Sequence, residues 1–452
     1  MGLGALSSAM SGMRGAQKRL DLASHNISNA QTPGYQRQVM EQRAAGSTNV
    51  GGVFSSSIVD PGGAIILGIS RVSDQGLSQR LVTSAGEGSA LAATAEQLKR
   101  LEAVFPEPDP NALGAQFAEF WAAWQGVSSQ PASTASRAGL LSQAESLVAS
   151  IRQASTAVQD LSFQASSRLD TTVSEINNLA SELASVSTSV MANDPSLSAT
   201  QDLMSHRDYL AAQLAEKTGG RVNIMAEGTF QFLLGGRPIV DGANSQQLTF
   251  SGGNVVWSAD NVAVTLGGTA LGLQTAVNGT FPAYQTSLDT IAAALVADVN
   301  ALHTTGYDQA GVTGVNFFDP ANVTAATISL DAAVSGNPAG IAAGGVFAPE
   351  DGDMARQIAG LARLSTGADA KYRDLIALLG VETRLAAGRA SAQESVTTSL
   401  EMALSEVTGV NIDEETVEIM AAQRAFQAAA RVITVVDEML ATLIERTGVV
   451  GR

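Results

Sequence analysis

Cysteine is absent from this chain of 452 residues, and histidine and lysine are scarce, with three and four copies. The absence of cysteine excludes disulfides, thiolate nucleophiles and zinc-thiolate sites. The three histidines, His25, His206 and His303, are scattered and have no partner at the spacing of a metal site or a catalytic triad. The formal net charge of −17, without any basic run, argues against nucleic acid as a partner, because phosphate binding needs a basic surface.

Long apolar runs are missing as well. None approaches the ~20 residues that a membrane-spanning helix needs, which predicts no membrane insertion. The N-terminus lacks the basic and apolar segments of a secretory signal peptide, and Leu6 stands where a myristoylation motif requires serine or threonine. By these rules the protein is cytosolic unless another export route exists.

Motifs of enzyme chemistry are also missing. The sequence has no G-x-S-x-G, no complete G-x-G-x-x-G and no Walker motif. The glycine-rich segment 303–320 has neither the P-loop lysine nor the carboxylate spacing of a calcium loop. Asp351 and Asp353 would suit general acid-base chemistry, but solvated loop carboxylates are the simpler interpretation. We therefore predict no enzyme, no metal site and no cofactor.

The strongest positive pattern lies in residues 409–447. Two apolar series run through it in steps of seven, three residues apart, which is typical of a coiled-coil seam on one long helix of roughly 50 Å. They are Ile419, Phe426, Ile433 and Leu440, and Ala422, Ala429, Val436 and Leu443. Asn411 is placed to cap the helix, and Glu414 to complete a capping box. A helix cannot bury such a stripe alone, so it needs a partner.

The first helix repeats this pattern more weakly, with Gln17 and Ser24 at two seam positions. Its apolar seam residues are Leu3, Leu6, Met10, Met13, Leu20 and Ile27. Residues 1–45 carry five basic and two acidic side chains, a net of +3, and residues 405–452 carry four basic and eight acidic ones, a net of −4. We expect the two ends to attract each other, and the first helix to be poorly ordered until it is paired.

A distinctive segment, N-I-S-N-A-Q-T-P-G-Y, follows that helix. Asn26 and Asn29 are suited to end a helix, because asparagine tolerates the left-handed conformation. Pro33 forces an extended residue before it, and Gly34 permits a tight turn that places Tyr35 as an anchor. At the opposite end, residues 409–415 read GVNIDEE, and residues 423–440 read QRAFQAAARVITVVDEML.

These paired terminal motifs resemble those of the axial proteins of the bacterial flagellum, and GVNIDEE points within them to the hook-associated junction-protein family. The resemblance implies a structural protein that is secreted without a cleaved signal peptide, through the flagellar type III apparatus, into the extracellular flagellum. It also implies an export chaperone at the C-terminal helix, and a ring of about eleven copies in contact with the hook protein and a second hook-associated junction protein.

The central part of the chain changes periodicity twice. Residues 137–191 and 197–217 predict two long helices in an antiparallel hairpin. Alternating residues from 222 to 266, with Gly-Gly pairs at 235, 252 and 267, predict antiparallel strands, and residues 326–334 a further strand. Helices are predicted again at 288–302, 354–364 and 372–407. Phe117, Phe120, Trp121 and Trp124 lie at helical spacing and predict one buried face.

The prediction is thus a multidomain α+β protein with a terminal α-helical coiled coil, a rod-like helical bundle and a small antiparallel β domain in the middle of the chain. The predicted domains are a coiled-coil assembly domain (1–45 with 408–452), an elongated helical domain with an extended connector (46–220 with 350–407), and a β-rich outer domain with one helix (221–349). The residues predicted to make subunit contacts are Leu3, Leu6, Met10, Met13, Leu20, Ile27, Asn29, Pro33, Gly34, Tyr35, Ile419, Phe426, Ile433, Val436, Leu440 and Leu443.

The predicted function is a structural component of the hook-filament junction. Its terminal stripes would stay mobile in the monomer and pair on assembly, with each other and with neighbouring copies. Two alternatives stay open at this point. One is a hook or distal-rod protein of the same superfamily, and the other is a secreted enzyme on a helical scaffold, for which the sequence offers no cleft of convergent polar groups.

Overall fold

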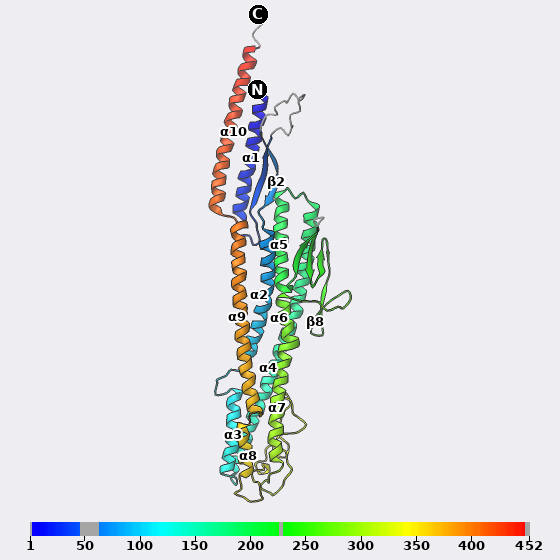
Figure 1. The fold of residues 1–452 in the computed structure, drawn as a ribbon, viewed down its shortest axis with the longest axis vertical. Coiled ribbons are helices and arrows are strands. Elements are labelled where there is room, and N and C mark those ends of the chain that lie inside the picture. Colours follow the sequence, from blue (N-terminus) through cyan, green and yellow to red (C-terminus); the bar gives the residue numbers. More distant parts are fainter. Residues whose placement is uncertain (1, 46–62, 226–228, 448–452) are drawn as a thin grey trace.

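The two chain ends lie together at one end of a long rod (Figure 1). The structure is a computed structural model, and it describes residues 2–45, 63–225 and 229–447. Helices run along most of the rod, and small sheets lie against it. This arrangement confirms the predicted multidomain α+β fold.

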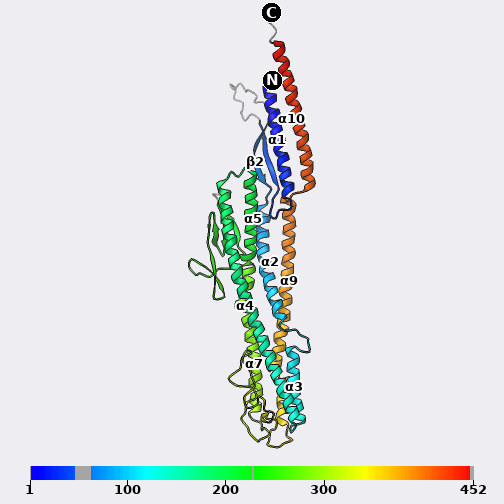
Figure 2. The same ribbon diagram turned by 180° about the vertical axis from the view of Figure 1, so that it is seen from behind.

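The terminal end of the rod is built from α1 (Gly2–Asn29) and α10 (Ile412–Thr447), which run antiparallel side by side in both views (Figures 1 and 2). An antiparallel hairpin of β1 (Gln38–Ala44) and β2 (Ala64–Arg71) packs beside α1, with a register shift between Glu41 and Gln42. The predicted pairing of the two ends is therefore present within a single chain.

The shaft contains the longest helices. α2 (Gln75–Glu102) and α9 (Ala368–Thr408) pack along each other. α4 (Thr134–Ala192) is an unbroken helix of 59 residues, which at 1.5 Å per residue is about 88 Å long. α5 (Ser198–Thr218) turns back along α4, which confirms the predicted hairpin. The Ser133 hydroxyl begins α4 by accepting a hydrogen bond from Ser136 N, and Gly219, with φ 67°, ends α5.

The end of the rod away from the termini contains the aromatic core. α3 (Leu113–Ser129), α7 (Phe281–His303) and α8 (Asp353–Gly360) surround the start of α4 there. The four aromatic residues predicted to form a buried face are all buried, and Trp124 packs edge-on against His303 and at a tilt against Phe317. Short 3-10 turns lie at Pro338–Gly340 and Leu361–Arg363.

The β domain lies on one side of the shaft. β3 (Arg221–Ile224), β4 (Phe230–Leu234), β5 (Arg237–Asp241) and β6 (Asn244–Ser245) form an antiparallel meander in chain order, and β7 (Leu248–Ser251) pairs with β8 (Asn254–Trp257). The glycine pairs at 235 and 252 make the turns with positive φ, as predicted. The buried faces of the strands pack with α4, α5 and α6 (Gly268–Thr275).

Three local predictions were wrong. Residues 326–334 form turns rather than a strand, because Ile328 and Val334 are drawn into the aromatic core. Residues 262–266 contribute one bridge, between Ala263 and Val256, rather than a strand. The glycine pair at 267 begins α6 instead of a hairpin, and a Cβ at Gly268 would meet Glu216 O at 2.4 Å.

The helix predicted at 288–302 is longer than expected. α6 continues through a five-residue π-helical turn (Ala276–Thr280) directly into α7. α7 and much of the chain after it pack in the aromatic core and not on the strands. The packing thus links much of segment 281–349 to the helical bundle, whereas the predicted boundaries had grouped it with the outer domain.

Candidate assembly site

The turn after α1 depends on a glycine. Gly34 has φ +75°, and a Cβ built on it would lie 2.6 Å from Tyr209 Cβ on α5. Only glycine combines this backbone conformation with so close an approach. The turn brings Tyr35 back to α1, where its hydroxyl donates a hydrogen bond of 2.7 Å to Asn26 Oδ1. Burial, together with the charges of Asp202 and Glu415, raises the pKa of Tyr35 well above its usual value, so the hydroxyl remains a donor.

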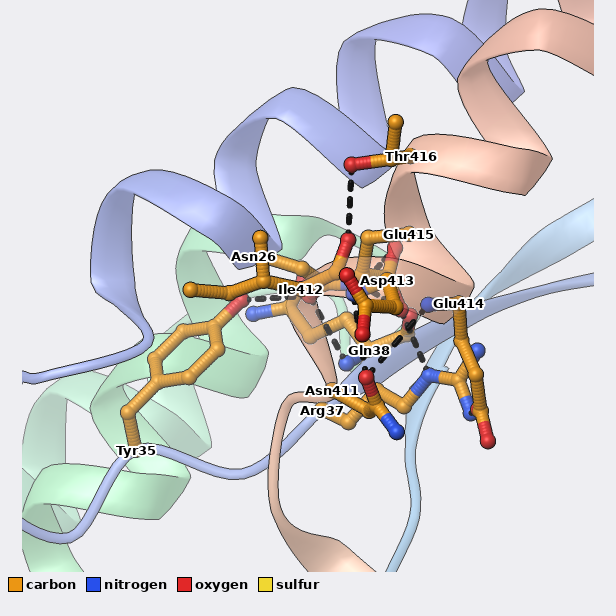
Figure 3. A network of polar contacts seen from close by, with 10 residues as sticks. All are labelled: Asn26, Tyr35, Arg37, Gln38, Asn411, Ile412, Asp413, Glu414, Glu415 and Thr416. Carbon is orange, nitrogen blue, oxygen red and sulfur yellow. Dashed lines mark hydrogen bonds and ion pairs between the residues drawn. The ribbon is translucent and has the colours of Figure 1, made fainter.

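Asn26 is the centre of the polar network drawn in Figure 3. Its side chain is 1% exposed, and its Oδ1 also accepts from Gln38 N at 3.0 Å. Its Nδ2 donates to Gln38 O at 2.9 Å and to Glu415 Oε2 at 3.1 Å. Two donated and two accepted bonds satisfy this buried amide fully. One side chain thereby joins α1, the turn, β1 and α10.

Arg37 joins the end of α9 to the start of α10. Its backbone N donates to Thr408 O at 2.8 Å, while its side-chain Nε and Nη1 donate to Glu415 Oε1 at 2.7 Å and Glu414 Oε2 at 3.0 Å. Glu415 is only 2% exposed, and a buried carboxylate is costly unless it is paired. Arg37 and Asn26 supply that pairing.

The predicted cap of the last helix is only partly as expected. Asn411 Oδ1 accepts from Asp413 N at 3.0 Å and from Glu414 N at 3.4 Å, which confirms the N-cap. The Glu414 carboxylate, which would complete a capping box, forms the ion pair with Arg37 instead. The acidic first turn of α10 thus serves the contact between the two ends of the chain.

The same network reaches the shaft through β1. Gln38 Nε2 donates to Asp202 Oδ1 at 2.6 Å, and Ser198 Oγ donates to Gln38 Oε1 at 2.6 Å. His25 Nε2 lies 3.2 Å from Asp202, so α1 is tied to the start of α5 as well. We call the set Asn26, Tyr35, Arg37, Gln38, Glu414 and Glu415 the terminal junction.

Above the terminal junction, α1 and α10 meet along a seam of small residues. Ala9, Ala16 and Ala23 of α1 are buried in this part of the molecule, as is Ala422 of α10. A Cβ on Gly12 would lie 4.0 Å from the Ala429 Cβ, so the helices approach closely here. Alanine buries little apolar surface, so this seam contributes less free energy per turn than one of leucine and isoleucine.

The larger residues predicted for the seam flank it. Val436 is buried, and a second group is half-buried: Leu6, Met13, Leu20, Ile27, Ile419, Ile433 and Leu440. Met10, Phe426 and Leu443 are exposed, at 39%, 39% and 57%. Leu3 lies in the first turn of α1, and its side chain is outside the described residues.

The other predicted residues belong to the turn. Asn29 ends α1, where its Nδ2 donates to His25 O at 3.0 Å and its backbone oxygen accepts from Thr32 N at 2.9 Å. Pro33 is exposed, while Gly34 and Tyr35 make the contacts described above. The structure thus brings Gly34 and Tyr35 to the terminal junction and leaves Pro33 at its surface.

Sequence reasoning overlooked two sets of residues. It did not single out Arg37 or Gln38, although both follow the turn motif directly. It also passed over Ala9, Ala16 and Ala23, which repeat every seven residues, one position before the apolar series. That alanine repeat was a visible signal, whereas the pairing of Arg37 with Glu415 was not.

Within 2–45, 63–225 and 229–447, no cluster of three or more potential metal-ligating side chains occurs. In the same ranges, no helix is long and apolar enough to cross a membrane. The terminal junction and its seam are the features that stand out.

Comparisons with known proteins agree on one kind of molecule. The model of the flagellar hook-associated protein FlgK helical domain matches residues 98–318. The flagella basal body rod protein model matches residues 6–36, and the model of the C-terminal part of the flagellar basal body rod FlgEFG proteins matches residues 403–446. The two end matches cover most of α1 and α10.

Individual relatives give the same picture. Flagellar hook-associated protein 1 of Bacillus subtilis (strain 168) is 24% identical over 503 residues, covering 99% of this chain and 99% of that protein. The Salmonella typhimurium protein of the same name is 26% identical over 334 residues, covering 69% of this chain and 59% of that protein. The flagellar hook junction protein FlgK from Burkholderia pseudomallei has a similar fold, with a TM-score of 0.61 at 14% identity, covering 72% of this chain and 99% of that chain.

Proposed function

We propose that this chain is a member of the flagellar hook-associated protein 1 family and a structural subunit of the junction between hook and filament, since a family model and its relatives agree on this. The family is one of structural flagellar proteins, so the chain is part of the flagellum and contacts other flagellar axial proteins. We propose in addition that it has no catalytic activity.

One structural observation supports the proposed role in assembly. The two ends of the chain project together from one end of the shaft, joined by the terminal junction (Figure 1). Beyond the seam, α10 exposes further large apolar side chains, namely Val417, Met420, Val432, Val435 and Met439. A helix that is apolar on more than one face is normally buried between several neighbours. In this chain α1 covers one face, which leaves the other for further subunits.

The alanine seam supports the proposal that the terminal helices stay mobile in the monomer and pair on assembly. Ala9, Ala16 and Ala23 bury little surface against α10, so the pairing within one chain is weak by itself. Contacts with neighbours would add the missing burial. We therefore propose that the terminal helices gain their full stability only on assembly, which restrains polymerisation before the subunit reaches its place.

The copy number, the neighbouring proteins and the export route that we propose rest on the family resemblance. We propose a ring of about eleven copies, in contact with the hook protein on one side and a second hook-associated junction protein on the other. We also propose export without a cleaved signal peptide through the flagellar type III apparatus, with a chaperone bound at the C-terminal helix. The predicted subunit-contact residues are part of this proposal, and so are the predicted domains, except that much of segment 281–349 is assigned to the helical domain because it packs there.

A strain whose own copy of the gene is deleted tests the function. Expression of the wild-type chain should restore filaments, whereas Ile433→Asp, or a chain that stops before Asn411, should leave hooks without filaments and shed flagellin into the medium. Ile433→Asp places a carboxylate on the half-buried flank of the seam. Thr434→Asp adds the same charge at an exposed position and serves as the control. Electron microscopy that shows normal filaments with Ile433→Asp would reject the assembly role of this seam.

A further inference from the structure

Several exposed charged residues on the terminal helices have no ion-pair partner among the described residues, and four of them share one spacing. Arg14 and Asp21 lie on α1, and Arg431 and Glu438 lie on α10. Their situation differs from that of Arg19, which lies 3.6 Å from Glu418 across the seam. All four are on the sides of the helices that face away from the seam.

The spacing of the four charges is complementary. Arg14 and Asp21 are seven residues apart, and so are Arg431 and Glu438, which places each pair on one face of its helix, two turns apart. The order of signs is positive then negative on both helices. Because α1 and α10 run antiparallel, a single register brings Arg14 opposite Glu438 and Asp21 opposite Arg431.

That register cannot form within one chain. Gly12 lies level with Ala429, and Asn26 lies level with Glu415, so Arg14 is level with Gln427 of its own α10. Glu438 lies eleven residues farther along α10, or about 17 Å at 1.5 Å per residue. The same offset separates the other pair. The complementary charges can be satisfied only by another molecule.

We propose that the other molecule is a second copy of this chain. The outer face of α1 in one copy packs against the outer face of α10 in the next, which is displaced by about 17 Å along the helix axis, toward the shaft. The same register places the exposed Val435 opposite Gln17, so some of the apolar surface that the seam leaves uncovered is covered together with the charges. This inference rests on the proposed function and specifies its subunit contact.

The charges determine the register of the contact more than its strength, since exposed ion pairs add little affinity. A slip by seven residues would place Arg14 opposite Arg431, which repel each other, and would leave one attractive pair, Asp21 with Arg424, in place of two. The contact joins two different surfaces, so it is heterologous. With a constant displacement between neighbours, the copies follow a helical path around the tube, so the proposed ring of about eleven copies is helical and not flat.

The absence of cysteine makes a clean crosslinking test possible. In the proposed register Gln17 lies opposite Val435, whereas within one chain they are about 17 Å apart along the axis, too far for a disulfide. The double variant Gln17→Cys with Val435→Cys, expressed in the deletion strain, should give a ladder of disulfide-linked dimers and larger species in isolated, oxidised hook-filament structures. Gln17→Cys with Ala428→Cys is the matched control, because Ala428 is an exposed position seven residues away on the same face.

Charge exchange provides the second test. Arg14→Glu in the background of Gln17→Cys and Val435→Cys should lose the ladder, and adding Glu438→Arg should restore it. Adding Arg431→Glu in place of Glu438→Arg should not restore it, because Arg431 faces Asp21. Lys18→Glu, the same charge change one turn away, should leave the ladder unchanged.

The two proposals fail in different ways. If wild-type expression does not restore filaments, the proposed function is rejected, and this contact is rejected with it. If filaments form but the ladder arises with Ala428→Cys, or with neither cysteine pair, the register proposed here is wrong while the junction function stands.

Discussion

Arg37 Nε lies 2.7 Å from Glu415 Oε1, although 378 positions separate the two residues in the sequence. The contact joins the residue just before β1 to the first turn of the last helix. The Arg37 backbone also binds Thr408, the last residue of α9. The joint between shaft and terminal helices is therefore held by one residue from the opposite end of the chain.

Removal of the Arg37 side chain tests this joint. Arg37→Ala should destabilise the start of α10 by about 3 kcal/mol, because it leaves the buried Glu415 carboxylate without its cation. Hydrogen exchange should show faster exchange in the first turns of α10 and unchanged exchange in α4. The double variant Arg37→Ala with Glu415→Gln should recover much of the loss, since a neutral amide needs no counterion. Equal protection in Arg37→Ala and the wild type would contradict this role.

Replacement of Gly34 should be costly for a reason independent of charge. Gly34→Ala meets both a positive φ and the Tyr209 side chain, so a loss of about 2 kcal/mol is expected in denaturant unfolding. Gly126→Ala is the control, because Gly126 is exposed within α3 and a Cβ there meets nothing within 4 Å. That change should stabilise the protein by about 0.5–1 kcal/mol through its better helix propensity. Similar effects of the two substitutions would contradict the close contact at Gly34.

Stability should fall in mild acid because of His303. Burial lowers the pKa of His303 to about 4, although the Val315 carbonyl opposes the shift. Its ring is suited to the neutral form, in which Nδ1–H donates to Val315 O and Nε2 accepts from Ala342 N. The unfolded chain binds a proton near pH 6.5 and the folded chain near pH 4. The neutral His303 ring therefore contributes about 3 kcal/mol to the free energy of unfolding above pH 6.5. This contribution decreases as the pH drops toward 4.

Denaturant unfolding at pH 7, 5.5 and 4 measures this effect. Carboxylates also titrate over the lower part of this range, so the informative quantity is the difference between wild type and His303→Gln. The variant should be less stable at pH 7, and the difference between the two proteins should shrink as the pH falls. A constant difference across the three pH values would show that His303 does not titrate in this way.

The terminal helices should be the first part of the free monomer to be cut by protease. The alanine seam buries little surface, so local opening there costs less than opening of the aromatic core around Trp124, and limited proteolysis should remove the first ~40 and last ~40 residues while sparing the middle. Mass spectrometry of the fragments identifies the cut sites. Intact, protected ends in the monomer would count against order on assembly.

Much of the architecture was readable from local patterns. The heptads of α10, the cap at Asn411 and the proline-free run of α4 specify helices through spacing and hydrogen bonding within a few residues. The glycine pairs at 235 and 252 specify turns in the same local way. The paired terminal motifs also pointed to the flagellar axial proteins, and family models of such proteins match both ends of the chain.

Other features depend on contacts between segments far apart in the sequence. The strand predicted at 326–334 became turns, because Ile328 and Val334 are buried in the aromatic core. In the same way, the face that α1 turns to α10 carries Ala9 rather than Met10 at its centre, since small side chains allow the helices to approach closely.

The sequence by itself determined which segments are helical and which carry apolar stripes, since those properties depend on neighbours three or four residues away. Only the tertiary structure decided which face of each stripe is used and that Arg37 meets Glu415. Such choices depend on volume, desolvation and hydrogen-bond partners supplied by remote parts of the chain.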